Sequence, residues 1–349
     1  MPRVFRIPFA RTLATCALAA LTLTVAPRDA AAAETSFKWR CQSLWAANSI
    51  NMKLFTAFTE RVRTMSGGRL DIEPLADGTV VKAGEMFNAV RNGILDCQNG
   101  GGGYNAKLDV AFILMGDLAG AYERPEQMQI WYEYRGGKEI ARELYAKYNT
   151  RHVGFVWHGV ESIPFNKPVR STADLEGVKL RAPTGPVSSI MSKFGAAPVT
   201  LHGAEVYPAL ERGVIEGTDW GTLSMNDDLG FHKIAKFPIY PGFHSMPATD
   251  IVVNMDRWNE LPDDLKMLLE VATRDFARDM VQTLVLADEK VVRDAAGSGV
   301  EFVNWSAEER KKFRTAAVAV WQELSEKTPA AKKVVDSQIA LLKELRLLD

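Results

Sequence analysis

The sequence contains few of the residues and motifs that mark several classes of enzyme and binding protein. It has three cysteines and five histidines among 349 residues, and no pair of histidines has the His-Glu-x-x-His spacing of a zinc site. It lacks a Gly-x-Ser-x-Gly elbow, and no Gly-Lys-Ser/Thr follows its glycine run. Its net charge of −1 and its 47% hydrophobic composition exclude a disordered chain, a collagen-like fibre and a strongly basic nucleic-acid-binding protein.

The longest apolar run lies near the N-terminus, where basic residues precede residues 13–25 and three alanines follow at 31–33. This order is typical of a secretory signal peptide, and the run is shorter than the roughly 20 residues of a membrane-spanning helix. We therefore expect residues 1–33 to be cleaved near Ala33, with the mature chain exported to the periplasm as a soluble protein.

Cys41 and Cys97 remain after this cleavage. In an oxidising compartment the two can pair. Each falls in a predicted strand of what can be one sheet, however, and bridging neighbouring strands strains disulfide geometry. The sequence leaves the pairing open.

Hydrophobic periodicity predicts alternating strands and helices through most of the chain, and mainly helices after residue 262. The predicted strands are 38–42, 70–75, 94–97, 153–157, 178–181, 214–217 and 249–254, with a further strand near Val199. The predicted helices are 49–65, 84–92, 125–148 and 185–194. Breaks in the helical C-terminal part are expected around 297–304 and at Pro329. This pattern predicts an α/β fold with parallel sheets.

A faint internal repeat indicates two similar lobes. The segment at 85–96 recurs at 205–216 with matching apolar, small and acidic positions. Each copy reads as a helix, a glycine cap at Gly93 or Gly213, and a strand. Since ligands gather beyond the carboxyl ends of strands in open α/β sheets, we expect the loops 98–104 and 217–221 to line one cleft.

Three charged residues near predicted strand ends are candidate ligand contacts. Arg181 ends a strand, and its planar guanidinium suits bidentate pairing with a carboxylate; the alternative is pairing with a structural acid. Asp219 follows a buried strand and needs a compensating partner. Glu161 follows the strand 153–157 and can approach the same space, so the two acids are candidate ligands of calcium or sodium. The alternatives are a helix cap at Asp219 and a surface acid at Glu161.

Neutral side chains complete the candidate site. The glycines at 100–103 allow close approach of a ligand or another backbone, and Tyr104 adds a hydroxyl. Trp45, Trp220 and Phe243 fall near predicted strand ends and can enclose a small ligand, although each is individually typical of core packing. His244 borders the same predicted pocket.

Two segments carry a resemblance to a known family. The run Glu205-Val-Tyr-Pro-Ala-Leu-Glu-Arg-Gly-Val-Ile-Glu-Gly-Thr-Asp219-Trp220, preceded by Asp174-Leu-Glu-Gly-Val-Lys-Leu-Arg181, resembles the solute-binding subunits of TRAP (tripartite ATP-independent periplasmic) transporters. The segments 227–231 and 240–242 are similar to the branch that binds 2-oxo acids and 2-hydroxy acids such as lactate. The resemblance extends over nearly all of the mature chain.

The resemblance implies a two-lobed periplasmic binding protein of the type II-like class, with a mainly parallel sheet in each lobe, crossing strands and a long connecting helix. On this basis we expect lobe I to comprise 34–158 and 249–290, and lobe II to comprise 159–248 and 291–349 with the C-terminal helices. The chain stops soon after the last predicted helix, so a dimer formed by exchange of a longer terminal helix is not expected. A monomer or weak dimer is expected instead.

The resemblance also assigns roles within the site. It implies that Arg181 pairs with the ligand carboxylate and that Glu161, Asp219 and the Trp220 carbonyl hold a metal ion that touches the ligand. Relatives typically carry glutamine where Glu161 stands, so the added charge favours calcium over sodium. The expected partners are a small organic acid anion and the membrane subunits of a TRAP transporter, with no enzymatic turnover. The alternatives are a binding protein of an ABC transporter, a sensor, and an exported metal-dependent hydrolase.

Overall fold

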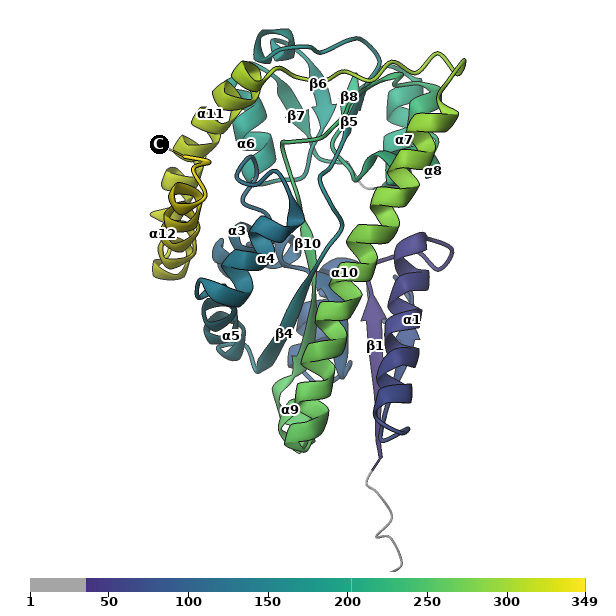
Figure 1. The fold of residues 1–349 in the computed structure, drawn as a ribbon, viewed down its shortest axis with the longest axis vertical. Helices are drawn as coiled ribbons and strands as arrows, with labels where there is room; N and C mark the ends of the chain where they lie inside the picture. The colour runs from purple at the N-terminus through teal and green to yellow at the C-terminus, as the bar shows by residue number, and fades with distance from the viewer. Residues whose placement is uncertain (1–35, 202, 349) are drawn as a thin grey trace, which may run out of the picture. The chain divides into compact units, whose positions relative to one another are not determined.

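The computed structural model describes residues 36–201 and 203–348. The predicted signal peptide at 1–33 lies outside these residues. None of the helices in the described part is both long enough and apolar enough to cross a bilayer. The described residues build two five-stranded sheets with helices packed against them (Figure 1). The predicted α/β fold class is therefore confirmed.

The first sheet has the strand order β2-β1-β3-β10-β4. β1 pairs in parallel with β2 and β3, whereas β10 lies antiparallel between β3 and β4. Every residue of β10 is buried, which is typical of a central strand covered on both faces. The strands of this sheet are β1 Phe37–Ser43, β2 Leu70–Leu75, β3 Cys97–Gly101, β4 Thr150–Trp157 and β10 Ala248–Asn254.

The second sheet has the strand order β7-β6-β8-β5-β9. β6 pairs in parallel with β7 and β8, and β5 lies antiparallel between β8 and β9. Its strands are β5 Ile163–Phe165, β6 Lys179–Arg181, β7 Ala197–Val199, β8 Gly217–Thr218 and β9 Phe237–Ile239. Both sheets are thus mixed, because one strand in each, β10 in the first and β5 in the second, runs antiparallel to the others.

The two sheets have the same topology, as the internal repeat predicts. In the first half, α2 leads through Gly93 into β3; in the second, α7 leads through Gly213 into β8. Gly93 and Gly213 adopt the left-handed backbone with φ of +73° and +68°, which glycine enters without steric cost. The strands β3 and β8 occupy the same third place in their sheets.

The helices follow from apolar spacing and from residues that begin or end a helix. In α1, for example, the Ser49 side chain accepts from the Met52 amide, and Phe55, Phe58 and Val62 face the core. The described helices are α1 Ile50–Met65, α2 Met86–Arg91, α3 Ala111–Gly116, α4 Pro125–Tyr134, α5 Gly137–Ala146, α6 Pro186–Lys193, α7 Gly203–Glu211, α8 Leu223–Asp228, α9 Met255–Glu260, α10 Asp263–Asp294, α11 Ala307–Ser325 and α12 Pro329–Glu344.

The single helix predicted over 125–148 is wrong, because the structure divides it into α4 and α5. The break lies at Gly136, whose φ of +83° is incompatible with a continuing right-handed helix. The breaks predicted in the C-terminal part are present, since α10 ends at Asp294, α11 starts at Ala307 and α12 starts at Pro329.

Two chain crossings and one long helix connect the sheets. The chain passes from β4 to β5 through 158–162 and returns from β9 to β10 through 240–247. The helix α10 packs on α1 and β4 beside the first sheet and on α8 beside the second (Figure 1). The C-terminal pair is divided in the same way, because α11 packs on α6 whereas α12 packs on α3, α4 and α5.

Cys41 on β1 and Cys97 on β3 are direct partners in the parallel register, with Cα atoms 4.5 Å apart. Their sulfurs form a disulfide. The pairing that the sequence leaves open is therefore made in the structure, within the buried part of the first sheet.

Candidate functional site

Three buried titratable side chains converge where the chain passes between the two sheets. Glu161 lies in the crossing from β4 to β5, Asp219 directly follows β8, and His244 lies in the crossing from β9 to β10. Their exposed fractions are 6%, 1% and 0%. One ligand atom from each of the three lies within 4.8 Å of the others. We call these three residues the acid–histidine cluster.

Hydrogen bonds hold the cluster together. His244 Nε2 donates to Asp219 Oδ1 at 2.8 Å, and the Glu161 carboxyl group is hydrogen-bonded to the Asp219 carboxylate. Ser245 bonds to Glu161 and also donates to Asp117 Oδ2 at 2.6 Å. The cluster therefore extends through Ser245 to a fourth buried group, Asp117, which directly follows α3.

Backbone hydrogen bonds fix the segments that carry these side chains. The Glu161 amide donates to the Ser245 carbonyl at 2.9 Å, and the Asp219 amide donates to the Arg181 carbonyl at 2.8 Å. Gly242 packs against the Glu161 backbone so closely that a Cβ atom there would overlap the Glu161 carbonyl oxygen. Only glycine fits this approach, so the crossing from β9 to β10 positions His244 beside Glu161.

Burial and mutual charge separate the pKa values of the two acids. Burial raises the pKa of Glu161 well above its usual range, and the nearby Asp219 and Asp117 carboxylates raise it further. Burial alone would also raise the pKa of Asp219, but the charge and hydrogen bond of His244 hold that pKa below its usual value. The two pKa values are therefore shifted in opposite directions, and Glu161 is the acid that keeps its proton to the higher pH.

Arg181 lies at the end of β6, beside this cluster. Its guanidinium carbon lies 4.6 Å from the centroid of the Trp220 ring, and it donates to the carbonyl oxygens of Asp219 and Leu201. Across residues 36–201 and 203–348 no carboxylate forms an ion pair with Arg181. The structural-acid alternative is therefore not realised. The hydrogen bonds and the ring contact of the guanidinium are to neutral groups, and its charge helps to lower the pKa of Asp219.

The predicted aromatic residues have different surroundings. Trp45 is half-buried, and its ring meets the edge of His158 with 5.0 Å between ring centroids. Tyr104 is 57% exposed, and burial of its hydroxyl end together with Asp77 raises its pKa, whereas the charge of Arg181 opposes this rise. Tyr104, which follows β3 of the first sheet, and Arg181, at the end of β6 in the second, are thus close enough to interact electrostatically.

Phe243 belongs to the hydrophobic core. Its exposed fraction is 4%, and its ring packs on Trp305 and Phe313 with centroids 4.9 and 5.3 Å away. Two aromatic residues from the C-terminal part therefore cover this side chain, and its contact with a ligand stays a prediction.

The sequence indicates Glu161 and Asp219 as a pair but misses two members of the network. His244 is predicted as a ligand contact, yet its side chain bonds to Asp219. Asp117 and Ser245 are not predicted at all. A signal for Asp117 exists, since it is an acid within an otherwise apolar stretch from Ala111 to Tyr122, where a buried carboxylate needs polar partners.

Comparison with known proteins places this arrangement in a family. Residues 42–328 match the model of the DctP family, described as bacterial extracellular solute-binding protein, family 7. A monocarboxylate 2-oxoacid-binding periplasmic protein of Nostoc sp. is 28% identical over 311 residues, which cover 88% of this chain and 85% of that protein.

Two solved structures have the same fold. A TRAP periplasmic solute-binding protein of Rhodobacter sphaeroides in an apo open form is 34% identical, with a TM-score of 0.79 and coverage of 89% of this chain and 99% of that one. A TRAP periplasmic solute-binding protein of Pseudoalteromonas atlantica with bound sodium and pyruvate is 25% identical, with a TM-score of 0.79 and coverage of 90% and 96%. The chain therefore belongs to the DctP family of TRAP solute-binding proteins.

Proposed function

We propose that this protein captures a small organic acid, a 2-oxo or 2-hydroxy monocarboxylate, and delivers it unaltered to the membrane subunits of a TRAP transporter. The observation that carries the proposal is Arg181, a guanidinium without a carboxylate partner in the described residues, next to the buried acid–histidine cluster. A ligand carboxylate supplies the missing counter-charge through bidentate hydrogen bonds. Support also comes from the 2-oxoacid-binding relative and from the pyruvate-bound structure.

The residues of the cluster fit a bound cation. Two carboxylates that share a proton in a buried site are costly, and a cation in place of that proton neutralises both. The donor set would be the carboxylates of Glu161 and Asp219 and the carbonyl of Trp220, while His244 would keep its hydrogen bond to Asp219. The two acids favour calcium, whereas the pyruvate-bound relative holds sodium. When bound, the cation would supply positive charge to the 2-oxygen of the ligand.

The remaining predicted residues have supporting roles in this proposal. Trp220 stacks on Arg181 and orients its guanidinium. Tyr104 and Trp45 would cover the ligand from the side of the first sheet. Ser245 and Asp117 position Glu161. Because a ligand would contact groups from both lobes only when the lobes are closed, its binding would shift the population toward the closed form.

Several finer predictions stay part of the proposal. These are a signal peptide at 1–33 cleaved near Ala33, a lobe I of 34–158 with 249–290, a lobe II of 159–248 with 291–349, and a monomer or weak dimer. Binding without turnover is proposed as well, since the DctP family consists of solute-binding transport components. The family match favours a TRAP transporter over the ABC-transporter and sensor alternatives.

A thermal-shift measurement on the mature chain tests the proposal. Pyruvate, lactate and succinate are each added with calcium, with sodium alone, and with a chelator. At 100 times the dissociation constant, a ligand stabilises the folded state by about 2.7 kcal/mol. We expect stabilisation by pyruvate or lactate that chelation reduces. Stabilisation by none of these acids, or conversion of the acid into a product, would contradict the proposal.

A further inference from the structure

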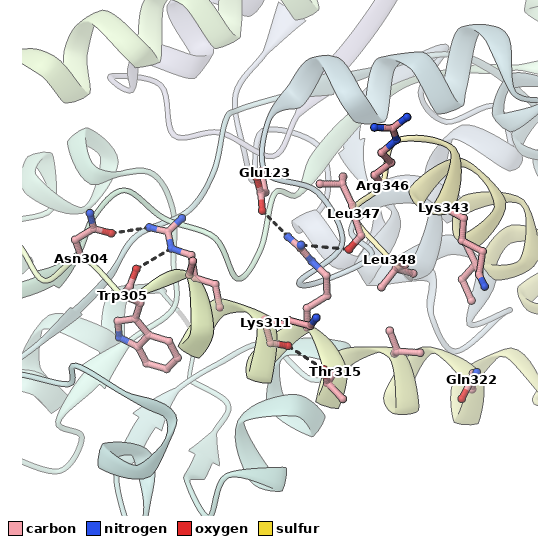
Figure 2. Close-up of a pocket in the computed structure, with 15 residues that line it drawn as sticks. Glu123, Asn304, Trp305, Lys311, Thr315, Gln322, Lys343, Arg346, Leu347 and Leu348 are labelled. Atoms are coloured by element: carbon pink, nitrogen blue, oxygen red, sulfur yellow. Dashed lines mark hydrogen bonds and ion pairs between the residues drawn. The ribbon is translucent and has the colours of Figure 1, made fainter.

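A second candidate binding site lies between α11 and the last turn of α12 (Figure 2). It is a groove of about 800 Å³ that is also bordered by Glu123, in the segment before α4. We call it the α11–α12 groove. Nothing in the proposed ligand site uses its residues.

The groove concentrates positive charge. Five of its lining residues are basic, and Glu123 is its one acid. The basic residues are Arg310, Lys311, Arg314, Lys343 and Arg346. By contrast, the whole sequence has nearly equal numbers of basic and acidic residues, 42 and 43. This local excess is therefore a property of the groove and not of the protein surface as a whole.

Arg310 is held rigidly by neutral groups. Its Nε donates to the Trp305 carbonyl at 3.1 Å, and Nη2 donates to Asn304 Oδ1 at 2.8 Å and to the Pro241 carbonyl at 3.1 Å. Its guanidinium carbon also lies 5.2 Å from the Phe243 ring centroid. In the described part of the chain Arg310 has no carboxylate within ion-pair distance. A cation fixed in this way loses little conformational entropy when it binds an anion.

The other basic side chains of the groove differ in how many hydrogen bonds and ion pairs they already form. Arg314 donates to Glu123 Oε1 at 2.9 Å and to the Gly120 and Leu347 carbonyls, and Figure 2 shows Glu123 and Leu347 on either side of this guanidinium. Lys343 and Arg346 are exposed and, among the described residues, form no ion pair. The positive charges of Arg310, Lys343 and Arg346 are thus not balanced by a carboxylate among the described residues.

The lining of the groove is partly apolar. It includes Val318 of α11, Ile339 of α12, and Leu347 and Leu348, which follow the end of α12. A lone inorganic anion would use the charges but not this apolar surface. A peptide that carries both acidic and apolar side chains matches both parts of the lining.

The groove also joins elements that pack against different sheets. α11 packs on α6 of the second half, whereas α12 packs on α3 and α5 of the first. A partner that docks between α11 and α12 therefore contacts helices anchored on both sides of the ligand site.

We propose that the α11–α12 groove docks an acidic segment of a protein partner. The partner would be a membrane subunit of the transporter, and only this identification rests on the proposed function. The charge complementarity would act mainly on the rate of encounter and on partner selection, so binding weakens as salt rises.

The test uses a fluorescein-labelled six-residue peptide of alternating glutamate and leucine and the full mature chain, with binding followed by fluorescence anisotropy at low and at high salt. The variant Lys343→Glu/Arg346→Glu reverses two exposed charges in the groove. The control Lys53→Glu/Lys147→Glu makes the same change in net charge on α1 and after α5, where both lysines are exposed and without an ion pair in the described residues. Circular dichroism checks that both variants are folded.

We expect the groove variant to bind the peptide with an affinity roughly tenfold lower than that of the native chain. The affinity of the control should stay within about twofold of the native value. Equal loss in both variants would overturn the proposal, because net charge alone would then explain binding. Absence of saturable binding by the native chain would overturn it too. The proposal would also be overturned if phosphatidylglycerol vesicles or inorganic phosphate bound in a groove-dependent way while the peptide did not bind.

Calorimetry of pyruvate and lactate binding to the same three proteins separates the two proposals. If none of them binds an organic acid but the peptide still depends on the groove, the proposed function fails and the docking surface stands. If the acids bind and the peptide does not, only the docking surface fails.

Discussion

His244 Nε2 lies 2.8 Å from Asp219 Oδ1, and both side chains are buried between the crossings that join the two sheets. The pair explains how Asp219 keeps its charge in a site where burial favours the protonated form. The pKa of Glu161, which shares this space, is raised instead, so Glu161 is the acid that keeps its proton to the higher pH. A bound metal ion would replace that proton and draw both acids into one donor set.

The first prediction concerns the acids of this cluster. Asp219→Asn and Glu161→Gln preserve side-chain size and remove one carboxylate each, so both should weaken calcium binding by roughly 10- to 100-fold or more. Isothermal titration with calcium measures the effect. Asp228→Asn, an exposed residue at the end of α8, is the matched control and should bind as the native chain does. Unchanged calcium affinity in Glu161→Gln would remove that residue from the donor set.

The second prediction concerns Asp250 on β10, whose carboxylate accepts from Tyr145 of α5 and from Gln98 of β3. Burial raises the pKa of Asp250 from 3.8 to about 6. At pH values between these two pKa values, the folded state binds more protons than the unfolded state. The free energy of unfolding therefore falls as the pH rises from about 4 to about 6. This component amounts to about 3 kcal/mol and is absent in Asp250→Asn.

Urea unfolding at a series of pH values measures this difference for the native chain, for Asp250→Asn and for the exposed control Asp228→Asn. The stability of the control should follow that of the native chain. Parallel stability curves for the native chain and Asp250→Asn across this window would show that Asp250 titrates normally in the folded protein.

The third prediction concerns the disulfide between Cys41 and Cys97, which closes a loop with a sequence separation of 56 residues. By loop entropy, a cross-link of this length stabilises the folded state by about 4 kcal/mol. The Cys41→Ala/Cys97→Ala variant and the reduced native chain should both unfold at lower urea concentration, while pyruvate affinity stays unchanged. Equal midpoints for the oxidised and reduced chains would contradict this prediction.

The fold was predictable because its signals are local and repeated. The helix, glycine and strand of residues 85–96 and 205–216 each fit a short window, and two equivalent sheets follow from them. The break at Gly136 was missed, because an isolated glycine in a periodic apolar pattern also fits a continuous helix.

The site was predictable only in part. Arg181, Asp219 and Glu161 stand near strand ends, where the topology of open sheets puts ligands. The roles of His244 and Asp117 depend on contacts between segments 25 and 128 residues apart, His244 with Asp219 and Asp117 with Ser245. No local pattern encodes such contacts. The packing of Phe243 is another such contact, since residues from α11 and the segment before it cover its ring.

The central claim is that Arg181 receives the carboxylate of the ligand. Titration calorimetry with pyruvate and lactate compares the native chain with Arg181→Ala, with Arg181→Lys, and with Arg212→Ala, an exposed arginine after α7. We predict a loss of about 2 to 5 kcal/mol of binding free energy in Arg181→Ala, a smaller loss in Arg181→Lys, and none in Arg212→Ala. Native affinity in a folded Arg181→Ala variant would contradict the account.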